Sequence, residues 1–181
     1  MLRQALHEMA ALSPCDQLAR LEALRQEHGH TIEALSAVGD DLAYNCVMFA
    51  LRVHDDADVY RVCALLTWGP DKALDISMDT GFVRALERRG LIVDVPPEEA
   101  DLLIYQHEGT ITHIGRLLPS GRVQSKWGTN HLYVHDALDV PIIYGSDLRR
   151  VTGPEPDVVY EEFITYARSK GAHFEEDGEA A

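Results

Sequence analysis

The sequence contains little cysteine and no long apolar segment. Its three cysteines, at positions 15, 46 and 63, are too few and odd in number for a disulfide framework, which favours a reducing compartment. No apolar run approaches the ~18 residues that a membrane span requires. Residues 1–8 lack the basic-then-apolar layout of a signal peptide. We therefore expect a cytoplasmic protein without membrane binding, with export by a route that needs no signal peptide left open.

Basic residues are also scarce. Sixteen Lys and Arg residues face thirty Asp and Glu residues, and the resulting net charge of −14 argues against binding to nucleic acids or anionic membranes. The stretch from His113 to His135 is the exception, because it contains Arg116, Arg122 and Lys126 and no acid. These cations either face a carboxylate on a substrate or pair with acids of the same chain, and the sequence leaves both open.

Length and composition allow one domain with a buried core, because the chain has 181 residues of which 46% are hydrophobic. After residue 90 the apolar pattern changes from a helical period to that of strands. This order predicts an α+β fold with an antiparallel sheet. We divide the chain into an N-terminal helical extension at residues 1–40, a core at residues 41–153, and a C-terminal helix with an acidic tail at residues 154–181.

Capping signals and apolar spacing place the individual elements. Ser13 and Pro14 start a helix that Gly29 ends, and Asp79 starts another that Gly90 ends. Further helices are predicted at residues 31–38, 42–51, 58–66 and 158–168. Strands are predicted at residues 91–93, 101–105, 110–118, 122–126, 132–134 and 142–144.

Cys46 is the first candidate for chemistry. It lies where a loop passes into an apolar helix, and the positive end of a helix dipole lowers a thiol pKa. The alternative is a core cysteine, since free cysteine is among the most buried residues. That alternative is stronger for Cys63, which lies between apolar residues in the middle of a helix, and Cys15 has no matching partner downstream.

His113 lies inside a predicted strand, where a polar side chain on a half-buried face needs a partner. A cysteine on a helix, followed by a histidine on the second strand of a sheet, is the order in which papain-like folds assemble nucleophile and base. The pair Cys46 and His113 therefore predicts a thiol site.

Three segments, Ala100–Tyr105, Thr112–Gly115 and Pro119–Ser125, resemble the core of the NlpC/P60-type cysteine peptidases and amidases. The resemblance implies a papain-like fold in which Cys46 is the nucleophile and His113 the base. It also implies that Ser125, or Gln124 beside it, orients the imidazole. This family usually has histidine, asparagine or glutamine at that position, so Ser125 is a departure from its pattern.

A closer resemblance covers residues 44–145 and is to a poorly characterised family of bacterial proteins. Its pattern is Asn-Cys-x-x-aromatic-Ala-Leu, Thr-His, Gly-x-aromatic-x-Ser-Lys-x-Gly, His and Tyr-Gly. The matching residues here are Tyr44–Leu51, Thr112-His113, Ser125–Gly128, His135 and Tyr144-Gly145, and Val123 replaces the aromatic residue. This resemblance implies a thiol site without identifying a substrate.

Other side chains complete the predicted site. Asn45 or the backbone N–H of Cys46 would stabilise an oxyanion, unless Asn45 only caps the helix. Four further residues are expected to contact a substrate, although the indole of Trp127 has packing in the core as its alternative role. These four are Tyr44, Lys126, Trp127 and His135.

The sequence therefore predicts a thiol hydrolase that transfers acyl groups without a cofactor. Its substrate would be a peptide or another amide, with or without a carboxylate. One alternative is a non-catalytic module on the same fold that binds a protein partner. Another is a zinc hydrolase using His113, His131 and His135. We consider it less favourable, because residues 132–134 are predicted to form a strand. At ~3.3 Å per residue, a strand would place His131 and His135 some 13 Å apart.

Overall fold

The computed structural model describes residues 1–35, 44–69 and 76–173, and this part of the chain has an α+β architecture. Its six α-helices are α1 (Leu2–Ala10), α2 (Pro14–His28), α3 (Cys46–Ala50), α4 (Ala57–Trp68), α5 (Thr80–Arg88) and α6 (Pro156–Ser169). Two single-turn 3-10 helices, η1 (Val53–Asp55) and η3 (Ile142–Tyr144), accompany them. No helix among the described residues is long and apolar enough to cross a membrane.

Seven strands form one sheet within the described residues, and neighbouring strands are antiparallel. They are β1 (Glu33–Leu35), β2 (Val93–Asp94), β3 (Leu102–His107), β4 (Thr110–Leu117), β5 (Val123–Lys126), β6 (Leu132–His135) and β7 (Asp147–Thr152). Their order is β1-β6-β5-β4-β3-β7-β2. The prediction of an α+β fold with an antiparallel sheet is thus confirmed.

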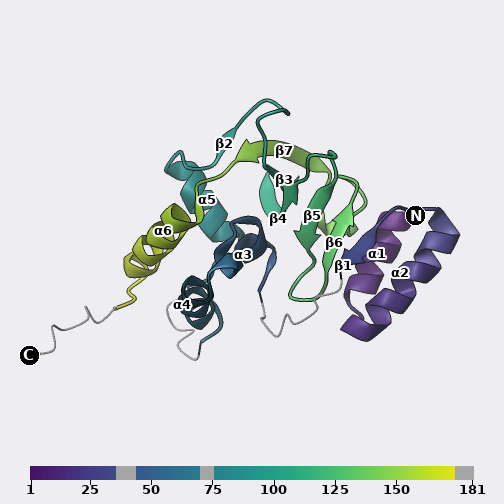
Figure 1. Cartoon of the computed structure of the whole chain (residues 1–181), viewed down its shortest axis with the longest axis horizontal. Coiled ribbons are helices and arrows are strands. Elements are labelled where there is room, and N and C mark those ends of the chain that lie inside the picture. The colour runs from purple at the N-terminus through teal and green to yellow at the C-terminus, as the bar shows by residue number, and fades with distance from the viewer. Residues whose placement is uncertain (36–43, 70–75, 174–181) are drawn as a thin grey trace, which may run out of the picture.

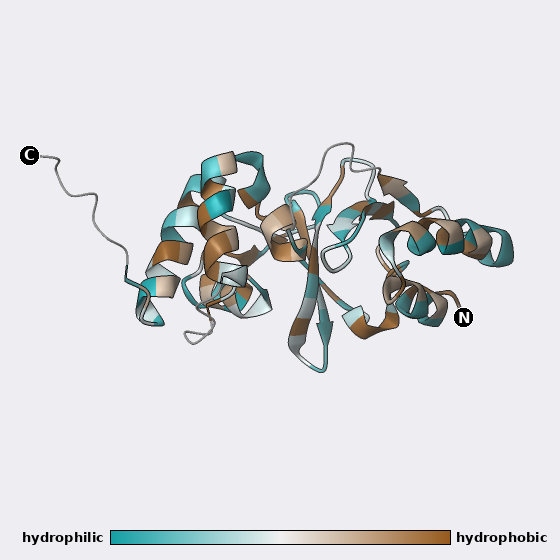
Figure 2. Cartoon of the chain, turned by 90° about the horizontal axis from the view of Figure 1, so that it is seen from below, coloured by the Kyte–Doolittle hydropathy of each residue, from teal (hydrophilic) through white to brown (hydrophobic). Residues whose placement is uncertain are grey.

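The sheet separates two hydrophobic cores, and helices cover each (Figure 1). Because side chains alternate along a strand, the pairs Ile104–Ile114 and Tyr105–His113 of the β3–β4 ladder lie on opposite faces. The α3-side core contains Met48, Phe82, Ile104, Ile114 and Phe163 among others. The α1-side core contains Leu6, Leu24, Tyr105, Trp127 and Tyr133 among others. In Figure 2 the N-terminal helices and the C-terminal helix lie at opposite ends of the molecule.

Capping side chains begin the helices as the sequence predicts. The Ser13 hydroxyl accepts a hydrogen bond from the Asp16 N–H, Pro14 occupies the first turn of α2, and Gly29 ends that helix with a φ of 69°. Asp79 accepts from the Gly81 N–H at the start of α5. These local contacts need no tertiary partner, which explains why the sequence alone predicts them.

Two predicted elements are wrong and one strand was missed. Residues 33–35 are not helical but form β1, because the open edge of β6 supplies backbone partners for them; residues 36–38 of that predicted helix lie outside the described residues. The predicted strand 142–144 is the turn η3, which Gly145 ends with a φ of 80°. The strand β7 was not predicted, and its pairing with β3 fixes it in the sheet.

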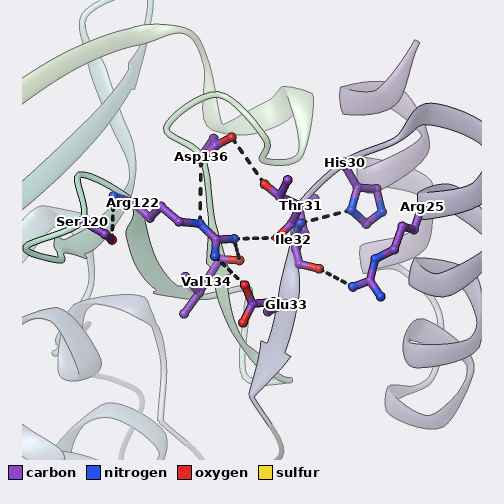
Figure 3. A network of polar contacts seen from close by, with 9 residues as sticks. All are labelled: Arg25, His30, Thr31, Ile32, Glu33, Ser120, Arg122, Val134 and Asp136. Atoms are coloured by element: carbon purple, nitrogen blue, oxygen red, sulfur yellow. Dashed lines mark hydrogen bonds and ion pairs between the residues drawn. The ribbon is translucent and has the colours of Figure 1, made fainter.

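Arg122 fastens β1 to the sheet (Figure 3). Its guanidinium donates to the carbonyl oxygens of Thr31 (2.6 Å) and Val134 (3.0 Å). Thr31 lies just before β1, and Val134 lies in β6, the strand that pairs with β1. It also forms ion pairs with Glu33 (2.5 Å) and Asp136 (3.8 Å). This cation of the acid-free stretch is therefore paired with acids of the same chain, one of the two roles that the sequence left open.

Candidate functional site

Asn45 sets the position of Cys46 at the start of α3. Its side-chain oxygen accepts hydrogen bonds from the N–H groups of Val47 and Met48, each at 3.0 Å. Its side-chain nitrogen donates to the Met78 carbonyl oxygen at 2.9 Å. The amide oxygen therefore caps α3, the alternative that the sequence left open for Asn45, and the amide nitrogen is engaged by Met78. The Cys46 N–H is not among the groups that Asn45 binds.

The Cys46 thiol is protonated at neutral pH. Burial raises its pKa to about 11, and the charge of Asp79 acts in the same direction. The N–H groups of Ile114, Cys46 and Val47 oppose this by donating hydrogen bonds that favour the thiolate. The outcome differs from the lowered pKa expected at a helix start, because loss of hydration outweighs these donors.

His113 is buried in the α1-side core, with 1% of its surface exposed. Its ring stacks on Tyr144 with centroids 4.0 Å apart and planes inclined by 5°, and Tyr105 lies 5.3 Å away. Burial and the charge of His135 both hold the pKa of the imidazole well below its usual value. His113 is therefore neutral at pH 7, and within the described part of the chain its Nε2 has no hydrogen-bond partner.

The structure brings the predicted nucleophile and base to adjacent backbone positions. The N–H that reaches the Cys46 thiol belongs to Ile114, the residue directly after His113. Tyr144 is related to both groups. Its ring stacks on His113, and its pKa, raised mainly by burial, is raised further by the charge of Cys46. Cys46 packs against the α3-side core and His113 lies in the α1-side core, so Tyr144 is the residue that relates the two. We call Cys46, His113 and Tyr144 the thiol cluster.

Ser125 lies on the same face of the sheet as His113 but bonds to a different histidine. Its hydroxyl is 2.8 Å from Nε2 of His135 and 3.1 Å from the indole nitrogen of Trp127. The Asp136 carbonyl oxygen lies 2.9 Å from Nδ1 of His135 and can only accept, so Nδ1 carries the proton. Ser125 therefore donates to His135 and accepts from Trp127. All three of these side chains are buried.

Gln124, the second residue predicted to orient the imidazole, points away from it. Gln124 pairs with Val134 and Ser125 pairs with Tyr133, so the two neighbours lie on opposite faces of β5. Tyr133 belongs to the α1-side core, and so does Tyr105, which pairs with His113 between β3 and β4. The orienting role of Ser125 or Gln124 stays a prediction, and only Ser125 shares the face of His113.

The four residues expected to contact substrate are buried: Tyr44, Lys126, Trp127 and His135. The ammonium of Lys126 lies 3.6 Å from the centroid of the Tyr44 ring, a cation–π contact. Trp127 packs against Tyr133, with ring centroids 4.2 Å apart. These side chains are thus part of the protein interior, and their contact with a substrate stays a prediction.

The histidines proposed for a zinc site bind different partners. His131 is hydrogen-bonded through Nε2 to the Pro14 carbonyl oxygen at 2.8 Å, whereas His135 bonds to Ser125. Among the described residues no group of three or more His, Cys, Asp or Glu side chains is placed to hold a metal ion.

Tyr144 and Gly145 belong to the sequence pattern, but the pattern assigns no role to either. Thr112 enters the pattern only as the neighbour of His113. In the structure the Thr112 hydroxyl lies 2.6 Å from the Tyr144 carbonyl oxygen. The joint presence of Thr-His and Tyr-Gly in one pattern was the available signal, but a contact across 32 residues cannot be read from spacing.

Comparison with known proteins identifies a family and no activity. A family model described as a domain of unknown function (DUF7689) matches residues 36–151, which include the whole thiol cluster and Ser125 and His135. Neither a curated protein nor a solved structure matches the chain. Because the match extends over more than half of the 181 residues, the chain belongs to the DUF7689 family.

Proposed function

We propose that this protein is a thiol hydrolase of papain-like, NlpC/P60-type architecture, with Cys46 as nucleophile and His113 as general base. The arrangement of elements supports the architecture, since a helix that begins at the cysteine packs against an antiparallel sheet that carries the histidine. The resemblance of the sequence motifs supports it independently. The substrate class we propose is a peptide or another amide.

The observation that carries the proposal is the buried, unpartnered Nε2 of His113, one residue before the backbone N–H that donates to the Cys46 thiol. Leaving a buried polar atom without a partner costs roughly 1–3 kcal/mol, and a catalytic role is one of the explanations for such an atom. A neutral imidazole, which has one unprotonated nitrogen, is the form that a general base requires. The lack of a hydrogen-bond partner for this buried nitrogen therefore supports a catalytic role for His113 over a packing role.

The reaction would proceed by acyl transfer. The Cys46 sulfur attacks the substrate carbonyl carbon while its proton passes to His113, and the Cys46 N–H would donate to the developing oxyanion. The proton then passes from His113 to the leaving amine as the carbon–nitrogen bond breaks, which leaves a thioester. His113 next takes a proton from water, the hydroxide displaces the sulfur, and the proton returns to the thiol.

One expected substrate feature lacks support. Arg122 was a candidate to bind a substrate carboxylate, but its guanidinium is engaged by Glu33, Asp136 and two carbonyl oxygens. The proposal therefore assigns Arg122 no substrate carboxylate.

A non-catalytic binding module is the second candidate, and the raised thiol pKa favours it. At pH 7 a thiol with a pKa of about 11 supplies almost no thiolate, so attack depends wholly on proton transfer to His113. A module that docks a protein partner needs no such transfer. Mutation of the thiol would leave its binding intact.

An acyl-trapping experiment separates the two. The protein is incubated with amide and thioester substrates of varied side chain, quenched in acid, and its cysteines are examined by mass spectrometry. We expect an acyl adduct on Cys46 that Cys46→Ala removes and His113→Ala slows, while Cys15→Ser, at an exposed cysteine, leaves it unchanged. An adduct that forms equally fast without His113, or no adduct with any substrate, would reject the hydrolase.

A further inference from the structure

Arg3 of α1 holds both ends of the segment that carries Tyr144. Its Nε donates to the carbonyl oxygen of Val140 at 3.3 Å, and its terminal nitrogen donates to that of Gly145. The turn η3 lies between these two carbonyls. One side chain from the N-terminal helix therefore closes residues 140–145 into a clamped loop, which we call the Tyr144 loop.

Three further contacts fix the Tyr144 loop against the sheet. The Thr112 hydroxyl donates to the Tyr144 carbonyl oxygen, and the Gly128 N–H donates to the Tyr144 hydroxyl. Gly145 lies so close to the Gln106 carbonyl that a Cβ at this position would collide with it, and its φ of 80° also favours glycine. The Tyr144 ring is thus held at its backbone and at its hydroxyl.

His113 depends on this ring for its orientation. In the papain-like arrangement a third polar residue would hold the imidazole, but here Ser125 is bonded to His135 and Trp127. The parallel Tyr144 ring at 4.0 Å is the contact that restricts rotation of the imidazole, together with Tyr105 at 5.3 Å. Stacking of this kind is worth roughly 0.5–1.5 kcal/mol beyond the area it buries.

We propose that Tyr144 is the positioning residue for His113, and that α1 sets its position through Arg3. The N-terminal helix, which precedes the matched residues 36–151, is then part of the working site. The kinetic consequence rests on the proposed function, because only a reacting His113 makes its orientation matter to a rate. Displacement of the Tyr144 loop would lower that rate without removing either reacting group.

Nuclear magnetic resonance of the His113 ring tests the positioning without reference to activity. Ring current from Tyr144 shifts the His113 Cε1 proton upfield, and His113→Gln assigns the signal. We expect Tyr144→Phe to keep the upfield shift, because the ring remains, and Arg3→Ala to reduce it. Arg20→Ala is the matched control, since Arg20 pairs on the surface with Glu27 and does not contact the loop.

Acyl-trapping rates supply the second readout. Loss of positioning by Arg3→Ala should slow acylation of Cys46 roughly 10- to 100-fold, as small misplacements of reacting groups do. Arg3→Lys should restore part of the rate, and Arg20→Ala should leave it unchanged. An unaltered His113 signal in a folded Arg3→Ala protein would overturn the positioning. A reduced upfield shift in Arg3→Ala, with no acylation even in the unmodified chain, would uphold the positioning and reject the proposed function.

Discussion

Acid should unfold this protein through His135. Burial and the charge of Arg122 lower the pKa of this imidazole from 6.5 to about 4, so the folded protein excludes a proton that the unfolded chain binds. A lowered histidine pKa gives stability that is fully present above pH 6.5 and is lost as the pH falls toward 4. His113 acts in the same direction, because its pKa is also lowered.

The magnitude follows from proton linkage. With pKa values of 6.5 unfolded and about 4 folded, His135 alone should lower the free energy of unfolding by about 2 kcal/mol between pH 7 and pH 5. Urea unfolding at the two pH values measures this difference. The variant His135→Gln provides the comparison, because its amide oxygen accepts from Ser125 but takes up no proton.

The two proteins should differ in their pH dependence rather than only in their stability. We expect the unmodified chain to lose about 2 kcal/mol more than His135→Gln on going to pH 5. A direct check is the His135 Cε1 proton signal, which should not titrate above pH 5. Equal losses in the two proteins, or titration of that signal near pH 6.5, would refute the linkage argument.

Three further predictions concern other parts of the structure. Ser125→Ala should lower the free energy of unfolding by about 2–4 kcal/mol in urea, because it leaves Trp127 and His135 without their buried partner, whereas Ser146→Ala at an exposed position should change it little. Arg122→Ala should speed amide hydrogen exchange in β1 and leave exchange in β3 unchanged; equal exchange in β1 would contradict its fastening role. Iodoacetamide at pH 7 should label exposed Cys15 first and Cys46 slowly, because the pKa of the Cys46 thiol is raised to about 11, and faster labelling of Cys46 would show an activated thiolate.

Local signals in the sequence predicted much of the fold. Ser13, Gly29 and Asp79 mark the ends of helices through contacts within a few residues. Strands at residues 101–105 and 110–118 were predicted, and β3 and β4 occupy these positions. Tertiary pairing decided what failed. β1 and β7 are held in the sheet by pairing with β6 and β3, and no local sequence pattern shows that these edges are open.

The candidate site divides in the same way. Cys46 and His113 were found from residue type and order along the chain, and the structure places the Cys46 thiol at the peptide that follows His113. The partner of Ser125 and the role of Tyr144 depend on which face of the sheet each side chain occupies. That choice requires the register of three strands, which spacing alone does not determine.

The contribution of α1, α2 and β1 to the α1-side core bears on how this protein should be produced. A fragment trimmed to the matched residues 36–151 would lack Leu6 and Leu24, leaving the large side chains Tyr105, Trp127 and Tyr133 facing water. It would also uncover the β6 edge that β1 occupies, and exposed strand edges recruit other chains. A recombinant fragment should therefore begin upstream of the family boundary, at α1, so that this core and the β6 edge stay covered.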